Sequence, residues 1–108
     1  MAFSVSITAG ARNDLRAIHS YIRENDSREK ADYVAQSILR VIQTLQEMPT
    51  RGVHPAELLN LGNRSYRELF FKPYRILYKI RENTVFIMLI ADGRRDMQSL
   101  LADRLVRR

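Results

Sequence analysis

The chain has 108 residues, of which 45% are apolar and 28% charged, a composition typical of one folded domain and not of a disordered segment. It contains no cysteine, which excludes a disulfide framework and a cysteine-based metal site. The net charge is +6, and residues 49–108 carry the whole excess, with twelve Lys and Arg against six Asp and Glu, a bias that favours an anionic partner.

No apolar run is long enough to span a bilayer, and the N-terminus has no basic start followed by an apolar stretch. We therefore expect a cytoplasmic protein that does not contact a membrane. The sequence also shows no metal-ligand spacing and no glycine-rich phosphate loop, so we expect neither a metal nor a cofactor.

Hydrophobic patterning predicts an N-terminal strand and then a helix. Residues 3–8 alternate strictly between apolar and polar, as in a half-buried strand. From Ala11 to Ile22 the apolar residues recur at helical spacing, and this helix should end near Asn25.

A second, longer helix is predicted to follow a short polar turn. Asp26 and Glu29 have the spacing of a capping box, which places Asp26 at the N-cap. Apolar residues then recur at intervals of three and four as far as Met48, and Pro49 ends the helix. The two helices should form an antiparallel hairpin whose apolar side must be buried.

The second half of the chain predicts a loop and three strands. Residues 50–65 read as loop, with a short helical turn at residues 56–61. Strands are predicted from Tyr66, over residues 74–81 and over residues 84–91, and the last of these is apolar on both faces and so should be central. Glu82 and Asn83 form a two-residue connection, with Asn83 able to take a positive φ.

A short C-terminal helix completes the chain. Asp96 is placed to cap its start, and Arg104, Arg107 and Arg108 suit the dipole at its end. The predicted fold class is α+β in one domain, residues 1–108. Its order is β-α-α-β-β-β, with the helical hairpin on one face of a small, mainly antiparallel sheet.

Alternation over residues 74–81 places tyrosines and cations on opposite faces of the sheet. Tyr74 and Tyr78 would pack under the helices, although they could also stack bases. Arg75, Lys79 and Arg81 would be exposed on the other face. Such a row touches either a polyanion or an acidic protein.

These elements resemble the RelE/ParE superfamily of toxins from bacterial type II toxin–antitoxin modules. The residues that carry the resemblance are Ala11-Arg12, Asp14-Leu15, Ile18, Tyr21-Ile22, Ala31, Ile42, Leu45, Pro49, Gly52, Glu57-Leu58, Gly62, Tyr66-Arg67-Glu68, Tyr74-Arg75-Ile76, Tyr78 and the run Asp92-Gly93-Arg94-Arg95-Asp96-Met97. The resemblance implies a toxin of a plasmid-stabilisation type, neutralised by a cognate antitoxin with which it forms a hetero-oligomer.

Two activities are implied by this superfamily. RelE-like members cleave mRNA on the ribosome, which needs cations at the phosphate and a general acid and base. For that activity the residues would be Arg75, Arg67, Lys72, Lys79, Arg94 and Glu57. ParE-like members instead poison DNA gyrase through a protein–protein interaction and need no catalytic residue.

The gyrase activity is favoured because the stretch after the last strand has neither Tyr nor His to supply an acid or base. His19 and His54 fit surface or packing roles, and Glu68 more simply pairs with a cross-strand cation. The expected residues for binding the target or the antitoxin are Arg75, Lys79, Arg81, Arg94, Arg95 and Arg104.

The alternatives are a ribosome-dependent endoribonuclease and a non-toxic interaction module derived from this fold. Sequence-specific DNA binding by the chain alone is not expected, since no helix-turn-helix or basic helix is recognisable.

Overall fold

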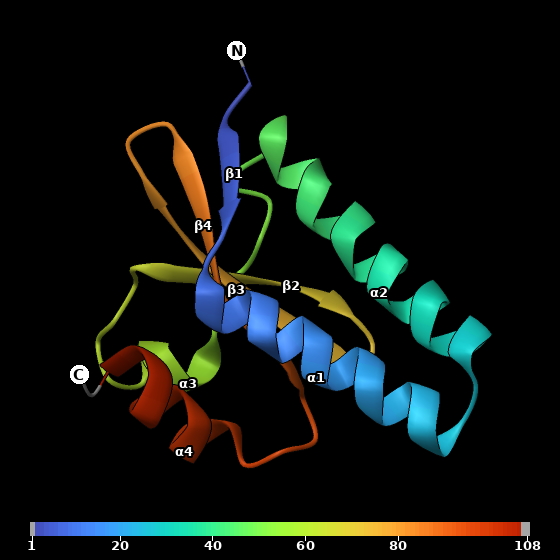
Figure 1. The fold of residues 1–108 in the computed structure, drawn as a ribbon. Helices are drawn as coiled ribbons and strands as arrows, with labels where there is room; N and C mark the ends of the chain where they lie inside the picture. The colour runs from blue at the N-terminus through green and yellow to red at the C-terminus, as the bar shows by residue number, and fades with distance from the viewer. Residues whose placement is uncertain (1, 107–108) are drawn as a thin grey trace.

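The computed structural model describes residues 2–106 and confirms the predicted order of elements (Figure 1). The strands are β1 (Ser4–Ile7), β2 (Tyr66–Phe71), β3 (Tyr74–Arg81) and β4 (Thr84–Asp92). The helices are α1 (Ala9–Asn25), α2 (Arg28–Gln43), α3 (Ala56–Leu59) and α4 (Met97–Leu101), with a 3-10 turn at Thr44–Gln46 and a π-helical turn at Ala102–Val106. Within the described residues, no helix is both long and apolar enough to cross a bilayer.

The four strands form one sheet in the order β1-β4-β3-β2, so β4 is central as predicted. β1 pairs with β4 in parallel, and the other two pairs are antiparallel. β1 is only four residues long and its register ends with Ile7 opposite Ile87. The part of β4 after Ile87 therefore has no strand partner on that side.

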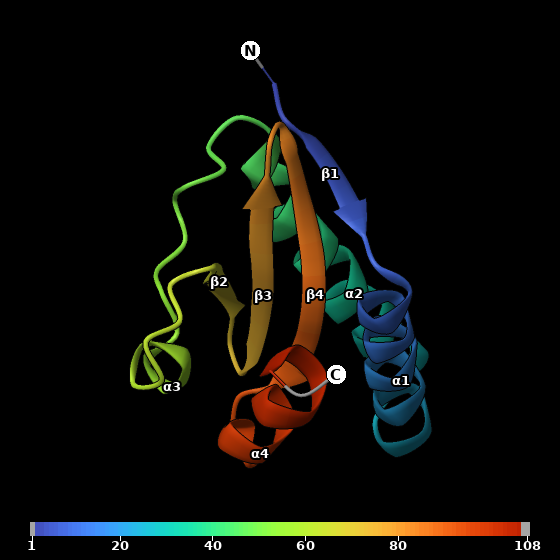
Figure 2. The same ribbon diagram turned by 90° about the vertical axis from the view of Figure 1, so that its left-hand side faces the viewer.

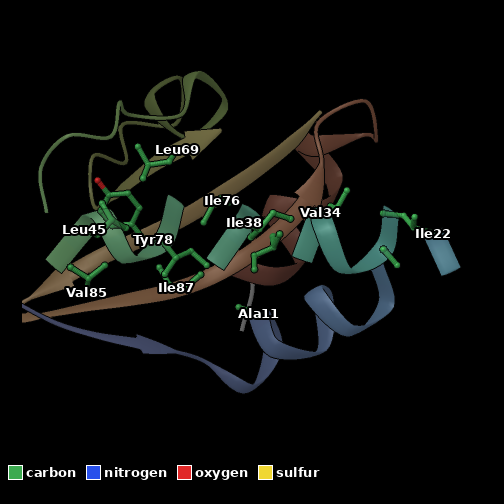
Figure 3. Packing of buried hydrophobic residues seen from close by; sticks show 13 residues of the cluster. Ala11, Ile22, Val34, Ile38, Leu45, Leu69, Ile76, Tyr78, Val85 and Ile87 are labelled. Carbon is green, nitrogen blue, oxygen red and sulfur yellow. The ribbon is translucent and has the colours of Figure 1, made fainter. Parts of the chain in front are cut away.

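The helical hairpin of α1 and α2 covers one face of the sheet, as Figure 2 shows from the side. Ile38 of α2 meets Ile76, Tyr78 and other side chains of the sheet in the larger core cluster (Figure 3). Ile42 of α2 belongs to the same cluster. Burial of these apolar side chains supplies most of the stability of the domain.

Tyr78 packs under the helices and does not form a stacking platform. Its side chain is fully buried, and its hydroxyl donates a hydrogen bond to the Pro49 carbonyl at 2.8 Å. The same oxygen accepts one from the Gly52 N–H at 2.9 Å. Tyr78 therefore ties the loop after α2 to the sheet.

The opposite face of the sheet is covered as well, which corrects the expectation of an exposed cationic face. A second cluster joins Leu77 and Leu89 of the sheet to Leu58 of α3 and to Met97 and Leu101 of α4. Alternation predicts only one apolar residue, Leu77, on this face of β3. The short helices α3 and α4, which bury Leu77, have only weak sequence patterns.

A β-bulge in β4 changes which of its apolar side chains face each core cluster. Leu77 pairs with Leu89 but Tyr78 pairs with Ile87, so Met88 is an extra residue in β4. The extra residue shifts the alternation, which turns Leu89 toward the second cluster and Ile90 toward the first.

Three local predictions are wrong. The N-cap of α2 is Ser27, whose hydroxyl accepts from the Lys30 N–H at 3.0 Å, and Asp26 instead ends α1. α2 ends at Gln43, and Met48 beyond it is 57% exposed. In the β3–β4 connection the positive φ (55°) belongs to Glu82.

The C-terminal segment is fixed at the unpaired part of β4 by an ion pair. Arg104 donates from Nη1 and Nη2 to the two carboxylate oxygens of Asp14 in α1, each at 3.0 Å. Asp14 Oδ2 also accepts the Ile90 N–H at 3.0 Å, and Arg104 Nη2 donates to the Met88 carbonyl at 3.2 Å. The pair thus takes the place of a strand at this edge.

Arg104 was predicted to serve the helix dipole and to contact a partner, and this contact with Asp14 is an internal one. Arg107 and Arg108, predicted for the same dipole, lie outside the described residues. Asp96 does cap α4, since its side chain accepts from the Ser99 N–H at 3.2 Å.

Asp14→Ala should lower the free energy of unfolding by about 2–3 kcal/mol, because it removes the carboxylate that pairs with Arg104 and leaves the Ile90 N–H without its acceptor in a partly buried place. Urea denaturation followed by circular dichroism measures the change. The matched control is Asp26→Ala, whose carboxylate makes only an exposed contact with Lys30 at 3.8 Å and should have little effect. If Asp14→Ala lowers the free energy of unfolding no more than Asp26→Ala does, the contact at the edge of β4 does not stabilise the fold.

Candidate functional site

Arg75 lies at the centre of a cluster of charged side chains on the α3 side of the sheet. Its Nη1 and Nη2 donate to the two carboxylate oxygens of Glu57 in α3, each at 2.8 Å. Its Nε donates to Glu68 Oε1 of the neighbouring strand β2 at 2.7 Å. The Arg75 side chain is only 13% exposed. We call Arg75, Glu57 and Glu68 the Arg75 triad.

Two features of the backbone place the triad. Glu68 and Arg75 lie on the same face of adjacent strands, with Glu68 opposite Leu77 and so diagonal to Arg75. Gly93 passes so close to Arg75 that a Cβ atom there would lie 2.9 Å from Arg75 Cδ and 3.1 Å from the Pro73 carbonyl oxygen. The glycine of the Asp92-Gly93-Arg94-Arg95 run therefore makes room for the Arg75 stem.

The pKa values of the two carboxyl groups of the triad are shifted in opposite directions. The hydrogen bonds from Arg75 lower the pKa of Glu57 below its ordinary value. For Glu68, burial outweighs the hydrogen bond from Arg75 and raises its pKa. The hydrogen bonds that Arg75 donates to Glu57 hold the pKa of Arg75 above its ordinary value, so its positive charge persists at every physiological pH.

The six residues predicted for a ribonuclease site are not brought together. Glu57 does meet Arg75, but Arg67 points to the opposite face and donates to the carbonyls of Gly52 at 2.9 Å and Thr50 at 3.2 Å. Lys72 lies in the β2–β3 turn. The other two, Lys79 and Arg94, lie at opposite ends of the sheet.

The predicted binding residues are also dispersed. Arg75 and Arg104 are engaged internally, whereas Lys79 is half-buried and Arg81 exposed at the far end of β3. Arg94 and Arg95 are exposed after β4, and Arg94 donates to Asp92 Oδ2 at 2.6 Å. The structure therefore places two of the predicted cations in internal ion pairs and leaves the others at separate places on the surface.

Both histidines make structural contacts. His19 Nε2 lies 2.7 Å from Asp32 Oδ1 and joins α1 to α2. His54 Nδ1 lies 2.9 Å from the Tyr66 carbonyl oxygen at the outer edge of β2. In the part of the chain that the structure describes, no group of three or more His, Cys, Asp or Glu side chains could hold a metal ion.

A groove of about 500 Å³ lies between the tip of the helical hairpin and the β2–β3 turn. Tyr21 of α1 and Tyr33 of α2 flank it and are 68% and 59% exposed. Tyr33 meets Phe71 edge to face, with ring centroids 6.1 Å apart. A second hollow of about 330 Å³ adjoins it and shares Tyr21, Tyr74 and Arg94 with it. We call the two together the tyrosine groove.

The tyrosine groove combines apolar rings with charged side chains of both signs. Lys30 contacts Asp26 at 3.8 Å and Arg94 pairs with Asp92 at 2.6 Å, whereas Lys72 and Arg95 form no ion pair among the described residues. Sequence reasoning did not identify this groove. Its only signal was that Tyr21 and Tyr33 each stand beside the apolar stripe of their helix, where an aromatic side chain remains exposed.

Comparison with known proteins places the fold and the family. Residues 5–97 match the family described as the ParE toxin of the type II toxin–antitoxin system parDE. The sequence matches none of the curated proteins significantly.

Solved structures from toxin–antitoxin systems have the same fold. A chain of the chromosomal ParDE toxin–antitoxin system from P. aeruginosa is 23% identical, with a TM-score of 0.72 over 84% of this chain and 96% of that one. A chain of the RelBE2 toxin–antitoxin complex from Mycobacterium tuberculosis is 20% identical, with a TM-score of 0.63 over 85% and 99%. A mutant of the E. coli toxin RelE in the free state is 13% identical, with a TM-score of 0.62 over 98% and 96%.

The triad predicts that Glu57→Gln and Glu68→Gln respond oppositely to pH. The stabilisation by Glu57 is present above its unfolded pKa and is lost as the pH falls through the lowered folded pKa, so the deficit of Glu57→Gln should shrink on acidification. At neutral pH we expect a deficit of about 1–2 kcal/mol after allowing for partial exposure.

Glu68 has a raised pKa, so the wild type gains stability as the pH falls through that pKa. The difference between wild type and Glu68→Gln should therefore shift in favour of the wild type on acidification. Urea denaturation of both variants at pH 7 and at a pH near 4 measures the two slopes. Parallel slopes would contradict the assigned directions.

Proposed function

Since this chain belongs to the ParE toxin family of type II toxin–antitoxin systems, we propose that it arrests bacterial growth by poisoning DNA gyrase in the cytoplasm. A cognate antitoxin neutralises it by forming a hetero-oligomer with it. The toxin acts through a protein–protein interaction and not as a nuclease.

The observation that carries this choice is the state of Arg75. In a RelE-like nuclease the corresponding arginine must present its guanidinium to a phosphate. Here Nε, Nη1 and Nη2 each already donate to a carboxylate of the same chain. A phosphate would have to displace Glu57 and Glu68 and leave two carboxylates unpaired in a largely buried place, which is unfavourable.

The groups beside Arg75 that could serve as the acid and base of RNA cleavage are Glu57 and Glu68, and Arg75 itself engages both. His19 and His54 are held elsewhere by Asp32 and by the backbone. Glu57 and Glu68 are the ion-pair partners of Arg75. These contacts support an interaction mechanism.

We place the antitoxin in the tyrosine groove. Its exposed rings offer the apolar anchors that dominate protein interfaces, and Lys72 and Arg95, which form no ion pair among the described residues, suit acidic side chains on the partner. An amphipathic segment with an acidic side would cover both kinds of surface at once.

The purified toxin should inhibit supercoiling by gyrase, and addition of the antitoxin encoded beside it should restore supercoiling. In parallel, mRNA should remain intact when the toxin is added to ribosomes engaged in translation. Supercoiling that is unaffected by excess toxin would refute the gyrase mechanism, and ribosome-dependent mRNA cuts would establish the nuclease alternative in its place.

The double variant Tyr21→Ala/Tyr33→Ala should bind the antitoxin at least about tenfold more weakly, because two exposed aromatic anchors are removed. Isothermal titration calorimetry with the purified antitoxin measures the affinity. Phe70→Ala is the control, since Phe70 is an exposed aromatic residue of β2 outside the groove. An affinity of the double variant equal to that of the control would place the antitoxin elsewhere.

A further inference from the structure

Two adjoining hollows lie where β2 begins, at the opposite end of the sheet from the tyrosine groove. One, of about 250 Å³, is lined by His54, Arg64, Ser65, Arg67 and Ile80. The other, of about 350 Å³, is lined by Asn63, Ser65, Tyr66, Lys79, Ile80 and Arg81. They share Ser65 and Ile80, so they form one surface, which we call the basic hollows.

The lining of the basic hollows contains cations and no carboxylate. Among residues 2–106, Arg64, Lys79 and Arg81 form no ion pair. Arg67 is held by the carbonyls of Thr50 and Gly52, which orients its guanidinium without neutralising it. The positive charge here is therefore free to act on a ligand, unlike that of Arg75.

The loop that carries Arg64 is ordered by its own contacts. The Ser65 N–H donates to Asn63 Oδ1 at 2.8 Å, a local turn that brackets Arg64. On the partner strand, Lys79 lies directly opposite Tyr66, and Arg81 ends β3. Strand pairing therefore brings cations from the loop before β2 and from the end of β3 to the same end of the sheet.

We propose that the basic hollows bind the phosphodiester backbone of duplex DNA without regard to sequence. Arg64, Lys79 and Arg81 would pair with phosphate oxygens, and the Ser65 hydroxyl could donate to one of them. The proposal goes beyond the gyrase assignment and does not require it, because the binding is a property of the toxin alone.

The composition of the surface selects duplex DNA among anionic partners. Several cations spread around a sheet end match a regular row of phosphates better than one small anion. A protein partner would need an exposed apolar anchor, whereas Tyr66, the one Phe, Tyr or Trp side chain in the lining, is 7% exposed. Single-stranded nucleic acid would need an open aromatic platform for stacking, and the buried Tyr66 cannot supply it.

Fluorescence anisotropy with a labelled mixed-sequence duplex tests the proposal on the full chain without gyrase. Binding should weaken with salt, with a slope of log K against log salt between about −2 and −4. Arg64→Glu/Arg81→Glu should weaken binding at least about tenfold at low salt and reduce the slope by about 2. Wild-type affinity should be the same for duplexes of unrelated sequence.

The matched control is Arg23→Glu/Arg28→Glu at the tip of the helical hairpin, outside the basic hollows. Each Arg→Glu change lowers the charge by two, so both double variants go from +6 to +2. The control should retain most of the affinity. Circular dichroism establishes that both variants are folded.

Three results would overturn the proposal. Equal losses in the two double variants would show that net charge alone attracts DNA. Tighter binding of single-stranded DNA would contradict the duplex assignment, and displacement of the duplex by a poly-glutamate peptide at equal charge would make an acidic protein the ligand. Supercoiling assays with the same variants are independent of these results, so a failure here leaves the gyrase assignment open to its own test.

Discussion

The central strand β4 is apolar on both faces, and both faces must be covered for the domain to fold. The helical hairpin covers one face, and the short helices α3 and α4 cover the other. The bulge at Met88 shifts the alternation along β4, so that Leu89 and Ala91 face the second cluster and Ile90 faces the first. Because β1 ends at Ile7, the edge of β4 beyond it needs a substitute partner, which Asp14 and Arg104 supply.

This double cover decides which cations can meet a partner. Closing α3 over the sheet brings Glu57 onto Arg75, and fixing the C-terminal segment brings Arg104 onto Asp14. Both arginines then serve the fold. The cations left for binding lie at the two ends of the sheet, with the tyrosine groove at one end and the basic hollows at the other. Their linings differ, one aromatic and cationic, the other polar and cationic, and so they suit partners of different chemistry.

Strong periodic patterns made the order of elements, the central place of β4 and the hairpin predictable from sequence. The predictions failed where a single contact decided between neighbours, as with Ser27 in place of Asp26 at the N-cap. They also failed where the cover was short, because four residues of α3 carry too little pattern to show that they would bury Arg75. The family was predictable from residues scattered along the chain in a fixed order. The tyrosine groove was not predictable, because its lining comes from segments that only the fold brings together.

The most direct test of the account replaces the whole Arg75 triad by neutral residues, Glu57→Gln/Glu68→Gln/Arg75→Met. If Arg75 is an internal cation, no charge is left unpaired, and the variant should fold cooperatively and still inhibit gyrase supercoiling as the wild type does. A variant that folds with wild-type cooperativity but has lost inhibition of gyrase and arrest of growth would show that Arg75 acts on the target. That result would contradict the account.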